Sequence, residues 1–214
     1  MIEKLHYITQ ELTGKTHPGL AEEVLREGKV RWVQLRVKNK PLKEVRAIAL
    51  ETQAVCRKYN AKFIINDHIQ LALEIGADGV HLGKQDMNTA EARKLSGTGF
   101  IVGGTANTFE DIKMHAAAGV DYIGVGPFRF TTTKEKLSPV LGLEGYKKIT
   151  QQCLATGIKT PLIAIGGIIP DDVRDILETG IYGVAIAGYI NHAEKKQDVI
   201  NEFLSKLEAA QLKA

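Results

Sequence analysis

The sequence contains few cysteines and no long apolar run. Its 214 residues include only two cysteines, Cys56 and Cys153, both inside helical patterns and without metal-ligand spacing. They predict buried small side chains rather than a disulfide or a zinc site. No segment approaches the roughly 20 apolar residues of a membrane span, and the first ten residues lack the apolar stretch of a signal peptide. The sequence therefore predicts a cytoplasmic protein that does not bind a membrane.

An excess of charge of one sign is also missing. The 28 Lys and Arg residues nearly balance the 25 Asp and Glu residues, and the net charge is +3. Because the basic residues are dispersed among acidic ones, the sequence argues against a nucleic-acid-binding face. A Walker loop and a GxGxxG dinucleotide signature are absent as well. The composition, with 44% hydrophobic residues, is that of a globular protein that needs neither disulfides nor a structural metal.

Short apolar runs alternate with helical patterns along the whole chain. Eight such units follow one another without a linker or a change in composition, which predicts a single-domain α/β fold over residues 1–214 and a (β/α)8 TIM barrel. A doubly wound open sheet is the alternative, but it would need edge features that the sequence lacks. The expected strands are 5–9, 31–38, 63–65, 79–82, 100–105, 121–128, 161–167 and 182–190. The expected helices follow Pro18 and lie at 42–59, 68–75, from 88, 108–119, 145–156, from 170 and at the C-terminus.

Two of the expected strands lead to a carboxylate. The run 63–65 breaks off at Asn66 and Asp67, and the run 79–82 breaks off before Asp86. Because a short helix would connect two parallel strands here, both carboxylates should reach the same rim. Magnesium is usually held by one or two carboxylates together with substrate phosphates. The alternatives are turn residues at 66–67 and a helix cap at Asp86.

Polar side chains alternate with apolar ones along the second expected strand. Gln34, Arg36 and Lys38 share one face because strand side chains repeat with period two. In a closed barrel this face looks into the lumen, so we interpret the three residues as a functional set. An edge strand with a solvated face is the alternative.

The segment FRFTTTKEK after the sixth expected strand offers hydroxyl donors and a cation. Thr131, Thr133 and Lys134 form a combination suited to a pyrophosphate. A solvated loop is the alternative, and Lys136 fits that interpretation.

Glycines follow the seventh and eighth expected strands, at Gly166, Gly167 and Gly188. A glycine lets the backbone approach a ligand closely, and barrels commonly bind a phosphate in these two loops. The sequence therefore predicts a phosphate site there.

His81 lies in the middle of the fourth expected strand. No Asp or Ser is placed to form a triad with it, so we interpret His81 as a structural or lumen-filling residue. Residue chemistry alone thus leads to a metal-assisted enzyme that acts on phosphorylated small molecules.

Seven motifs, in this order and spacing, resemble the thiamine phosphate synthase family over nearly the whole chain. They are VQLRVK at 33–38, FIIND at 63–67, ADGVHLGKQD at 77–86, DYIGVGPF at 121–128, TTTK at 131–134, GLEG at 142–145 and IAIGGI at 163–168. The resemblance implies a transferase of thiamine biosynthesis. Such an enzyme joins an aminopyrimidine-methyl pyrophosphate to a thiazole phosphate, with magnesium, and forms thiamine monophosphate and pyrophosphate. The family's mechanism is dissociative: pyrophosphate leaves first, and the thiazole nitrogen captures the pyrimidine cation.

The resemblance also implies roles for matching residues. Asp67 and Asp86 would hold Mg²⁺, and Arg36, Asn66 and Lys134 would be catalytic. The implied substrate-binding residues are Gln34 for the pyrimidine, Arg36, Lys38, Asn66 and Lys134 for the pyrophosphate, and Thr105, Thr131, Thr133, Gly167, Ala187 and Gly188, most of them for the thiazole phosphate.

Two positions depart from the family pattern. The family usually has Ser-x-His after strand five, where this chain has Thr105-Ala106-Asn107, and Gly188 replaces a serine at the end of strand eight. Since Thr105 keeps a hydroxyl and Gly188 keeps only its amide, these changes bear on substrate affinity rather than on reaction type.

Two other functions compete with the synthase. A related thiazole tautomerase has its proton-transfer histidine where this chain has Pro127, and it lacks the residues found here as Asp67 and Lys134. A catalytically silent barrel that binds a phosphorylated ligand is the second alternative, against which the set Arg36, Asp67, Asp86 and Lys134 argues. The sequence leaves a homo-oligomer open.

Overall fold

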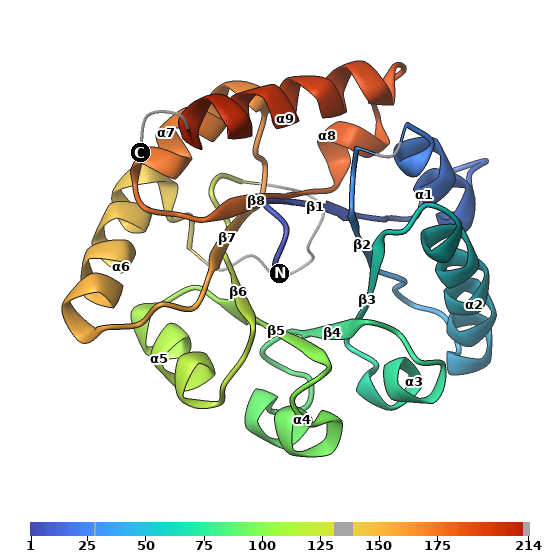
Figure 1. Cartoon of the computed structure of the whole chain (residues 1–214), viewed down its shortest axis with the longest axis horizontal. Helices are drawn as coiled ribbons and strands as arrows, with labels where there is room; N and C mark the ends of the chain where they lie inside the picture. Colours follow the sequence, from blue (N-terminus) through green and yellow to red (C-terminus); the bar gives the residue numbers. More distant parts are fainter. Residues whose placement is uncertain (28, 131–138, 212–214) are drawn as a thin grey trace.

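The computed structural model describes residues 1–27, 29–130 and 139–211. Eight strands alternate with helices along the chain (Figure 1). The strands are β1 (Leu5–Ile8), β2 (Trp32–Leu35), β3 (Lys62–Asn66), β4 (Gly79–Leu82), β5 (Ile101–Ala106), β6 (Tyr122–Val125), β7 (Leu162–Ile165) and β8 (Gly183–Ile186). The helices are α1 (His17–Leu25), α2 (Leu42–Lys58), α3 (Ile69–Glu74), α4 (Thr89–Ser96), α5 (Phe109–Ala117), α6 (Gly142–Thr156), the 3-10 turn η1 (Pro170–Asp172), α7 (Val173–Glu178), α8 (Gly188–Asn191) and α9 (Lys196–Gln211).

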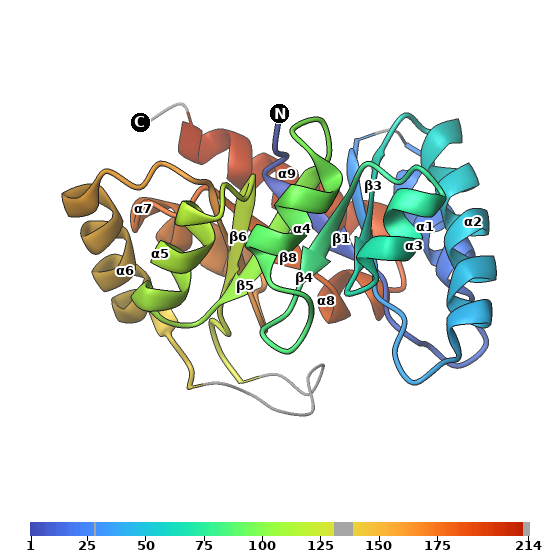
Figure 2. The same cartoon turned by 90° about the horizontal axis from the view of Figure 1, so that it is seen from below.

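The strands close into a parallel barrel. Each strand pairs with the next one along the chain, and β8 pairs with β1 through Leu5 and Val184. Helices surround the barrel in both views (Figures 1 and 2). The predicted (β/α)8 barrel is therefore confirmed, and the open doubly wound sheet is wrong. Because a closed barrel has no edge strand, the solvated-edge interpretation of the second strand is also wrong.

Both faces of the strands are buried, as expected for parallel strands covered by helices. Trp32, Ile64 and Tyr122 belong to a cluster inside the barrel, whereas the intervening Val33 and Phe63 pack in the larger cluster under the helices. The alternation predicted for the second strand thus separates a lumen face from a helix-covered face.

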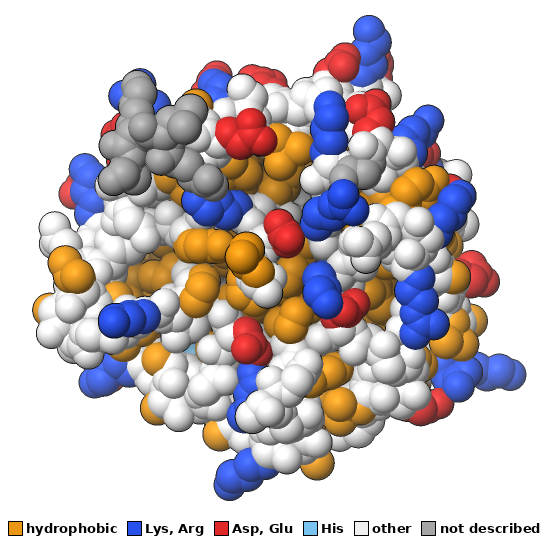
Figure 3. Space-filling view, in the orientation of Figure 1, with side chains coloured by type: hydrophobic (Ala, Val, Ile, Leu, Met, Phe, Trp, Pro, Cys, Tyr) orange, Lys and Arg blue, Asp and Glu red, His pale blue; other side chains and the backbone are white. Residues whose placement is uncertain are grey.

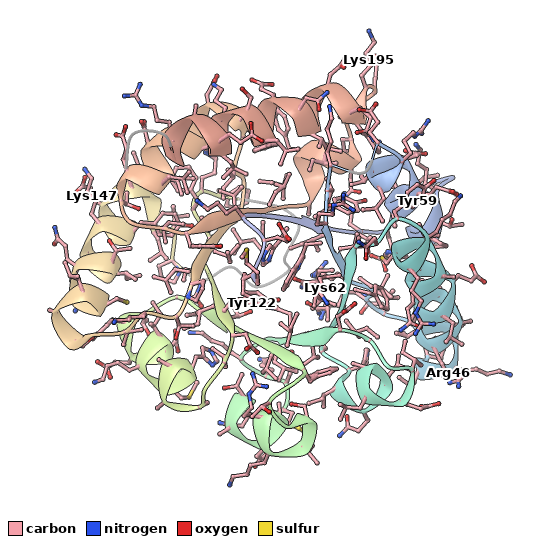
Figure 4. All side chains as sticks on the ribbon, in the orientation of Figure 1. Arg46, Tyr59, Lys62, Tyr122, Lys147 and Lys195 are labelled. Carbon is pink, nitrogen blue, oxygen red and sulfur yellow. The ribbon has the colours of Figure 1, made fainter. Side chains whose placement is uncertain are left out.

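Aromatic rings fill part of the barrel interior. The ring of His6 stacks on Trp32 at 4.1 Å, and Tyr122 meets both rings edge-on at 5.1 and 5.3 Å. Tyr122 points into the barrel in Figure 4. A Cβ atom on Gly103 of the neighbouring strand would lie 2.2 Å from Cζ of Tyr122. The glycine in β5 therefore makes room for the tyrosine ring.

Several predicted boundaries need correction at the strand ends. The strand expected at 31–38 ends at Leu35, and the one expected at 121–128 ends at Val125. The strand expected at 182–190 ends at Ile186, and the apolar residues that follow start the helix α8. The helix expected from 145 begins at Gly142 instead. Short apolar runs give the same signal in a buried strand and in a buried helix turn, which explains the error in β8.

The starts of the helices expected from 88 and from 108 were predicted more closely. Thr108 and Asp111 form a capping box at the start of α5, with the Asp111 N–H donating to the Thr108 hydroxyl at 3.2 Å. Asn88 caps α4 and accepts a hydrogen bond from the Ala90 N–H at 2.8 Å. Side-chain caps of this kind are local, and so they are readable from sequence.

The surface shows no block of charge of one sign on the face seen in Figure 3. Hydrophobic side chains gather over the barrel there, and Lys, Arg, Asp and Glu side chains alternate around them. None of the helices in the described part of the chain is long and apolar enough to cross a membrane.

Candidate functional site at the carboxyl ends of the strands

Asp67 and Asp86 lie next to each other. Asp67 follows β3 directly, in a left-handed backbone conformation with φ of 70°, and Asp86 lies four positions beyond the end of β4. Their carboxyl groups hydrogen-bond to each other. The Gly83 N–H donates to Oδ2 of Asp86 at 2.6 Å, which holds this carboxyl group in place. The structure thus brings together the two carboxylates that the sequence predicted to share a rim.

The two carboxyl groups titrate as a pair. Burial raises the pKa of Asp86, and the hydrogen bond and negative charge of Asp67 raise it further. Burial opposes ionisation of Asp67 as well, but the hydrogen bond from Asp86 and the ion pair with Lys38 lower the pKa of Asp67 below its usual value. In this arrangement Asp67 is the ionised member and Asp86 retains a proton more readily.

The donor set fits a hard divalent cation. Two facing carboxylates repel each other when both are ionised, and a cation between them would remove that repulsion. Within residues 1–27, 29–130 and 139–211, no cluster of three or more His, Cys, Asp or Glu side chains could hold a metal ion. Two carboxylates leave several coordination positions for water or phosphate oxygens, which is how magnesium sites are usually built.

Gln34 and Asn66 meet at the top of the lumen. Nε2 of Gln34 donates to Oδ1 of Asn66 at 2.8 Å, and both residues are buried. This contact fixes the orientation of both amides, so the remaining Asn66 amide group has a defined direction.

Arg36 and Lys38 lie just beyond β2, on the side of Gln34. Lys38 is exposed and makes an ion pair with Asp67. Arg36 is half-buried, and its backbone N–H donates to the Thr9 hydroxyl at 3.1 Å. The Arg36 guanidinium makes no hydrogen bond or ion pair within the described part of the chain. It remains available for an anion.

His81 lies in the lumen, as its position in the strand predicted. Its Nε2 is 2.9 Å from the Thr105 hydroxyl and its Nδ1 is 3.0 Å from the Tyr122 hydroxyl. His81 therefore orients Thr105, one of the predicted substrate-binding residues. Asn107, the third residue of the departure from the family pattern, donates from Nδ2 to the Gly126 carbonyl.

The glycine loops after β7 and β8 have unusual backbone conformations. Gly166 and Gly167 adopt φ of 104° and 67°, which side chains with a Cβ rarely tolerate. Ala187 precedes α8, and Gly188 is its first residue. Beside Gly188, Nε2 of Gln10 lies 3.0 Å from Nε2 of His192.

The remaining predicted residues, Thr131, Thr133 and Lys134, lie outside the described residues, as does Lys136. Sequence reasoning also missed Arg129 and Asp172, which form an ion pair between the loops after β6 and β7. Arg129 directly follows the strand expected at 121–128, whereas Asp172 lies in the first turn of the helix expected from 170.

The fold and this rim define a (β/α)8 barrel with its polar groups at the carboxyl ends of the strands, where barrels of this class carry their activity. The sequence profile described as "Thiamine monophosphate synthase" matches residues 5–190. A thiamine-phosphate synthase of Phocaeicola vulgatus is 56% identical over 168 residues, which cover 78% of this chain and 81% of that relative. A thiamine-phosphate synthase of Flavobacterium johnsoniae is 47% identical over 209 residues, 98% of each chain. The solved thiamine phosphate pyrophosphorylase from Pyrococcus furiosus superposes with a TM-score of 0.83 at 32% identity, covering 97% of this chain and 96% of that one.

The chain belongs to the thiamine monophosphate synthase family. The resemblance that the sequence motifs indicated is therefore confirmed.

Proposed function

We propose that this protein is a thiamine-phosphate synthase, a transferase that joins an aminopyrimidine-methyl pyrophosphate to a thiazole phosphate. The observation that carries the proposal is the convergence of Asp67 and Asp86 with Lys38, beside Arg36, at one rim of a family barrel. Acidic and basic groups together suit a diphosphate with a bound metal ion. A tautomerase needs neither a metal ion nor a pyrophosphate.

Asp67 and Asp86 are the proposed ligands of Mg²⁺. A bound metal ion neutralises charge on pyrophosphate oxygens and so makes pyrophosphate a better leaving group. The two carboxylates fit this task because they supply hard oxygen ligands without filling the coordination sphere.

Cationic and amide groups are proposed to act on the same pyrophosphate. Arg36, Lys38 and Lys134 supply positive charge, and Asn66 supplies an amide donor. Arg36, Asn66 and Lys134 are the proposed catalytic residues, because donors fixed before the reaction stabilise the charge that develops as pyrophosphate leaves. Gln34, whose amide donates to Asn66, is the proposed contact for the pyrimidine. In this mechanism the thiazole nitrogen is the nucleophile, and no nucleophilic side chain is required.

The thiazole phosphate is proposed to bind at the opposite side of the rim. Its proposed contacts are the hydroxyls of Thr105, Thr131 and Thr133 and the backbone of Gly167, Ala187 and Gly188. The positive φ and the exposed position of Gly167 support this assignment, since a glycine lets a ligand approach the backbone closely.

We also propose that the whole chain acts as one domain in the cytoplasm, and that its partners are phosphorylated small molecules rather than nucleic acid or membrane. A homo-oligomer is compatible with this function. Membership of a biosynthetic family supports these assignments.

The direct test is turnover with both substrates, measured as thiamine monophosphate formed with and without Mg²⁺. We expect product and stoichiometric pyrophosphate with Mg²⁺ and little of either after chelation. Tautomerisation of a thiazole substrate without condensation would favour the isomerase instead. Binding of either substrate without any reaction would favour the silent barrel.

A further inference from the structure

One residue, Arg129, holds both peptide groups that flank Gly167. Its backbone N–H donates to the Gly166 carbonyl at 3.1 Å, and its Nη1 donates to the Gly167 carbonyl at 2.8 Å. A peptide group is planar and trans, so its N–H points opposite to its carbonyl. By fixing these two carbonyls, Arg129 also fixes the directions of the Gly167 and Ile168 N–H groups.

Asp172 in turn holds the guanidinium of Arg129. Its Oδ1 and Oδ2 accept from Nη2 and Nη1, both at 2.7 Å, and its side chain is only 13% exposed. Oδ2 also accepts from the Ile169 N–H at 2.9 Å. A bidentate pair of this kind combines charge with a fixed geometry. Asp172 therefore locks the arginine and the backbone of the loop after β7 in one arrangement.

The packing of Arg129 against the loop after β7 requires a glycine at position 167. A Cβ atom there would lie 2.4 Å from Cγ of Arg129, and φ is 67°. Gly167 is exposed, and its N–H donates to no protein acceptor among the described residues. A loop that is tightly held but leaves this donor open is suited to an anionic ligand.

We propose that Arg129 and Asp172 are positioning residues for the phosphate of the thiazole substrate. They do not touch the substrate, but they hold the Gly167 N–H in the direction from which it donates to a phosphate oxygen. The inference rests on the proposed function, and it adds two residues outside the family motifs quoted above. Lysine at position 129 could hold one of these acceptors, but it lacks the planar fork that binds a carboxylate and a carbonyl together.

The test compares Asp172→Asn and Arg129→Lys with Asp171→Asn. Asp171 is the adjacent aspartate, 79% exposed and paired with Lys206 on the outside of the barrel, so it is a matched control. We expect the KM for the thiazole phosphate to rise about tenfold in the first two variants, equivalent to about 1.4 kcal/mol. The KM for the pyrimidine pyrophosphate and kcat should stay within about twofold of the wild type, because a positioning defect at one subsite affects one substrate. The control should match the wild type in all three quantities.

A rise in both KM values together, or an unchanged KM for the thiazole phosphate, would overturn the inference. The ¹⁵N resonance of the Gly167 amide gives a second readout that does not depend on turnover. It should shift when the thiazole phosphate is added to the wild-type protein and shift much less in Asp172→Asn. If the wild type forms no product but the Gly167 resonance still responds as expected, the proposed reaction fails and the positioning role stands. If product forms and the resonance does not move, the positioning role fails alone.

Discussion

At the scale of single residues, the proposed metal ligands Asp67 and Asp86 are expected to couple metal binding to protonation. Burial and the neighbouring Asp67 raise the pKa of Asp86, and Lys38 pairs with Asp67. A metal ion at this pair would compete with a proton for Asp86 and with the Lys38 ammonium group for Asp67. Affinity for the metal should therefore decrease as the pH is lowered, and the decrease should begin at a higher pH than for an ordinary aspartate.

Replacing Asp67 with asparagine should reduce kcat by about 10²- to 10³-fold with Mg²⁺ present, because it removes a proposed metal ligand that would stabilise the leaving group. Steady-state kinetics with both substrates measure this effect. The exposed Asp171→Asn substitution is the control and should retain full activity. A normal kcat in the Asp67 variant would show that this carboxylate does not hold the metal.

Replacing Asp86 with asparagine should raise the Tm of the metal-free protein at neutral pH while abolishing Mg²⁺-dependent turnover. The asparagine side chain can accept from the Gly83 N–H and donate to Asp67, as the protonated acid does. Since burial and Asp67 raise the folded-state pKa of Asp86, its ionised form destabilises the fold above that pKa. The penalty vanishes below the unfolded-state pKa of about 3.9, so the gain in Tm should also disappear there.

Differential scanning calorimetry between about pH 3 and pH 8 measures this dependence. Asp175→Asn, on an exposed position of α7, is the control and should show no such pH-dependent gain. A variant of Asp86 with a lower Tm at neutral pH would show that the carboxylate stabilises the fold instead.

At the residue scale, the sequence predicted which side chains meet where they lie within a few positions of a strand end. Asp67 and Asp86 could be placed together because parallel strands bring their ends to one rim. The pair of Arg129 and Asp172 joins segments 43 positions apart and depends on how two loops fold against each other. Neither propensity nor periodicity carries that information, so the pair was not predicted.

At the scale of elements, the glycines of β5 are part of the core packing. Gly103→Ala should lower the free energy of unfolding by about 1–3 kcal/mol, because the new methyl group would overlap the Tyr122 ring. Chemical denaturation followed by circular dichroism measures the change. Gly99→Ala is a matched control, since nothing lies within 4 Å of its Cβ position and it has no positive φ. Equal stability of the two variants would contradict the prediction, because it would mean that the barrel accommodates a methyl group at position 103 without loss of stability.

Sequence patterns predicted the order and type of the elements better than their ends. The Thr108 capping box and the eight alternating units depend on local signals, and the structure contains them. The strand ends after Leu35 and Ile186 depend on where the barrel stops pairing, which is a property of the closed sheet. The apolar residue Ile190 is buried in a helix turn and therefore gave the same pattern as a strand.

At the scale of the whole molecule, closure of the barrel is what joins distant parts of the chain into one site. Side chains after β2, β3 and β4 meet because these strands are consecutive neighbours in the sheet. The pairing of β8 with β1 brings Gln10 within 3.0 Å of His192 in the same way. The sequence predicted this convergence once eight units had been recognised, since the alternation itself implies a closed parallel barrel.

Binding of an ion-bound diphosphate at this rim should therefore stabilise the entire barrel, not one loop. At a ligand concentration about 100 times Kd, the stabilisation is about 2.7 kcal/mol, and about 2–4 °C per kcal/mol for a chain of this size gives a rise in Tm of roughly 5–11 °C. Thermal unfolding with Mg²⁺ and inorganic pyrophosphate together measures it, with pyrophosphate plus a chelator as the comparison. In Asp67→Asn the rise that depends on Mg²⁺ should be lost, whereas in Asp171→Asn it should remain, because Asp171 is 79% exposed and pairs with Lys206 of α9. A Tm rise of equal size with chelator and with Mg²⁺ would mean that pyrophosphate binds to the cationic residues alone. Asp67 and Asp86 would then not hold a metal ion for pyrophosphate binding.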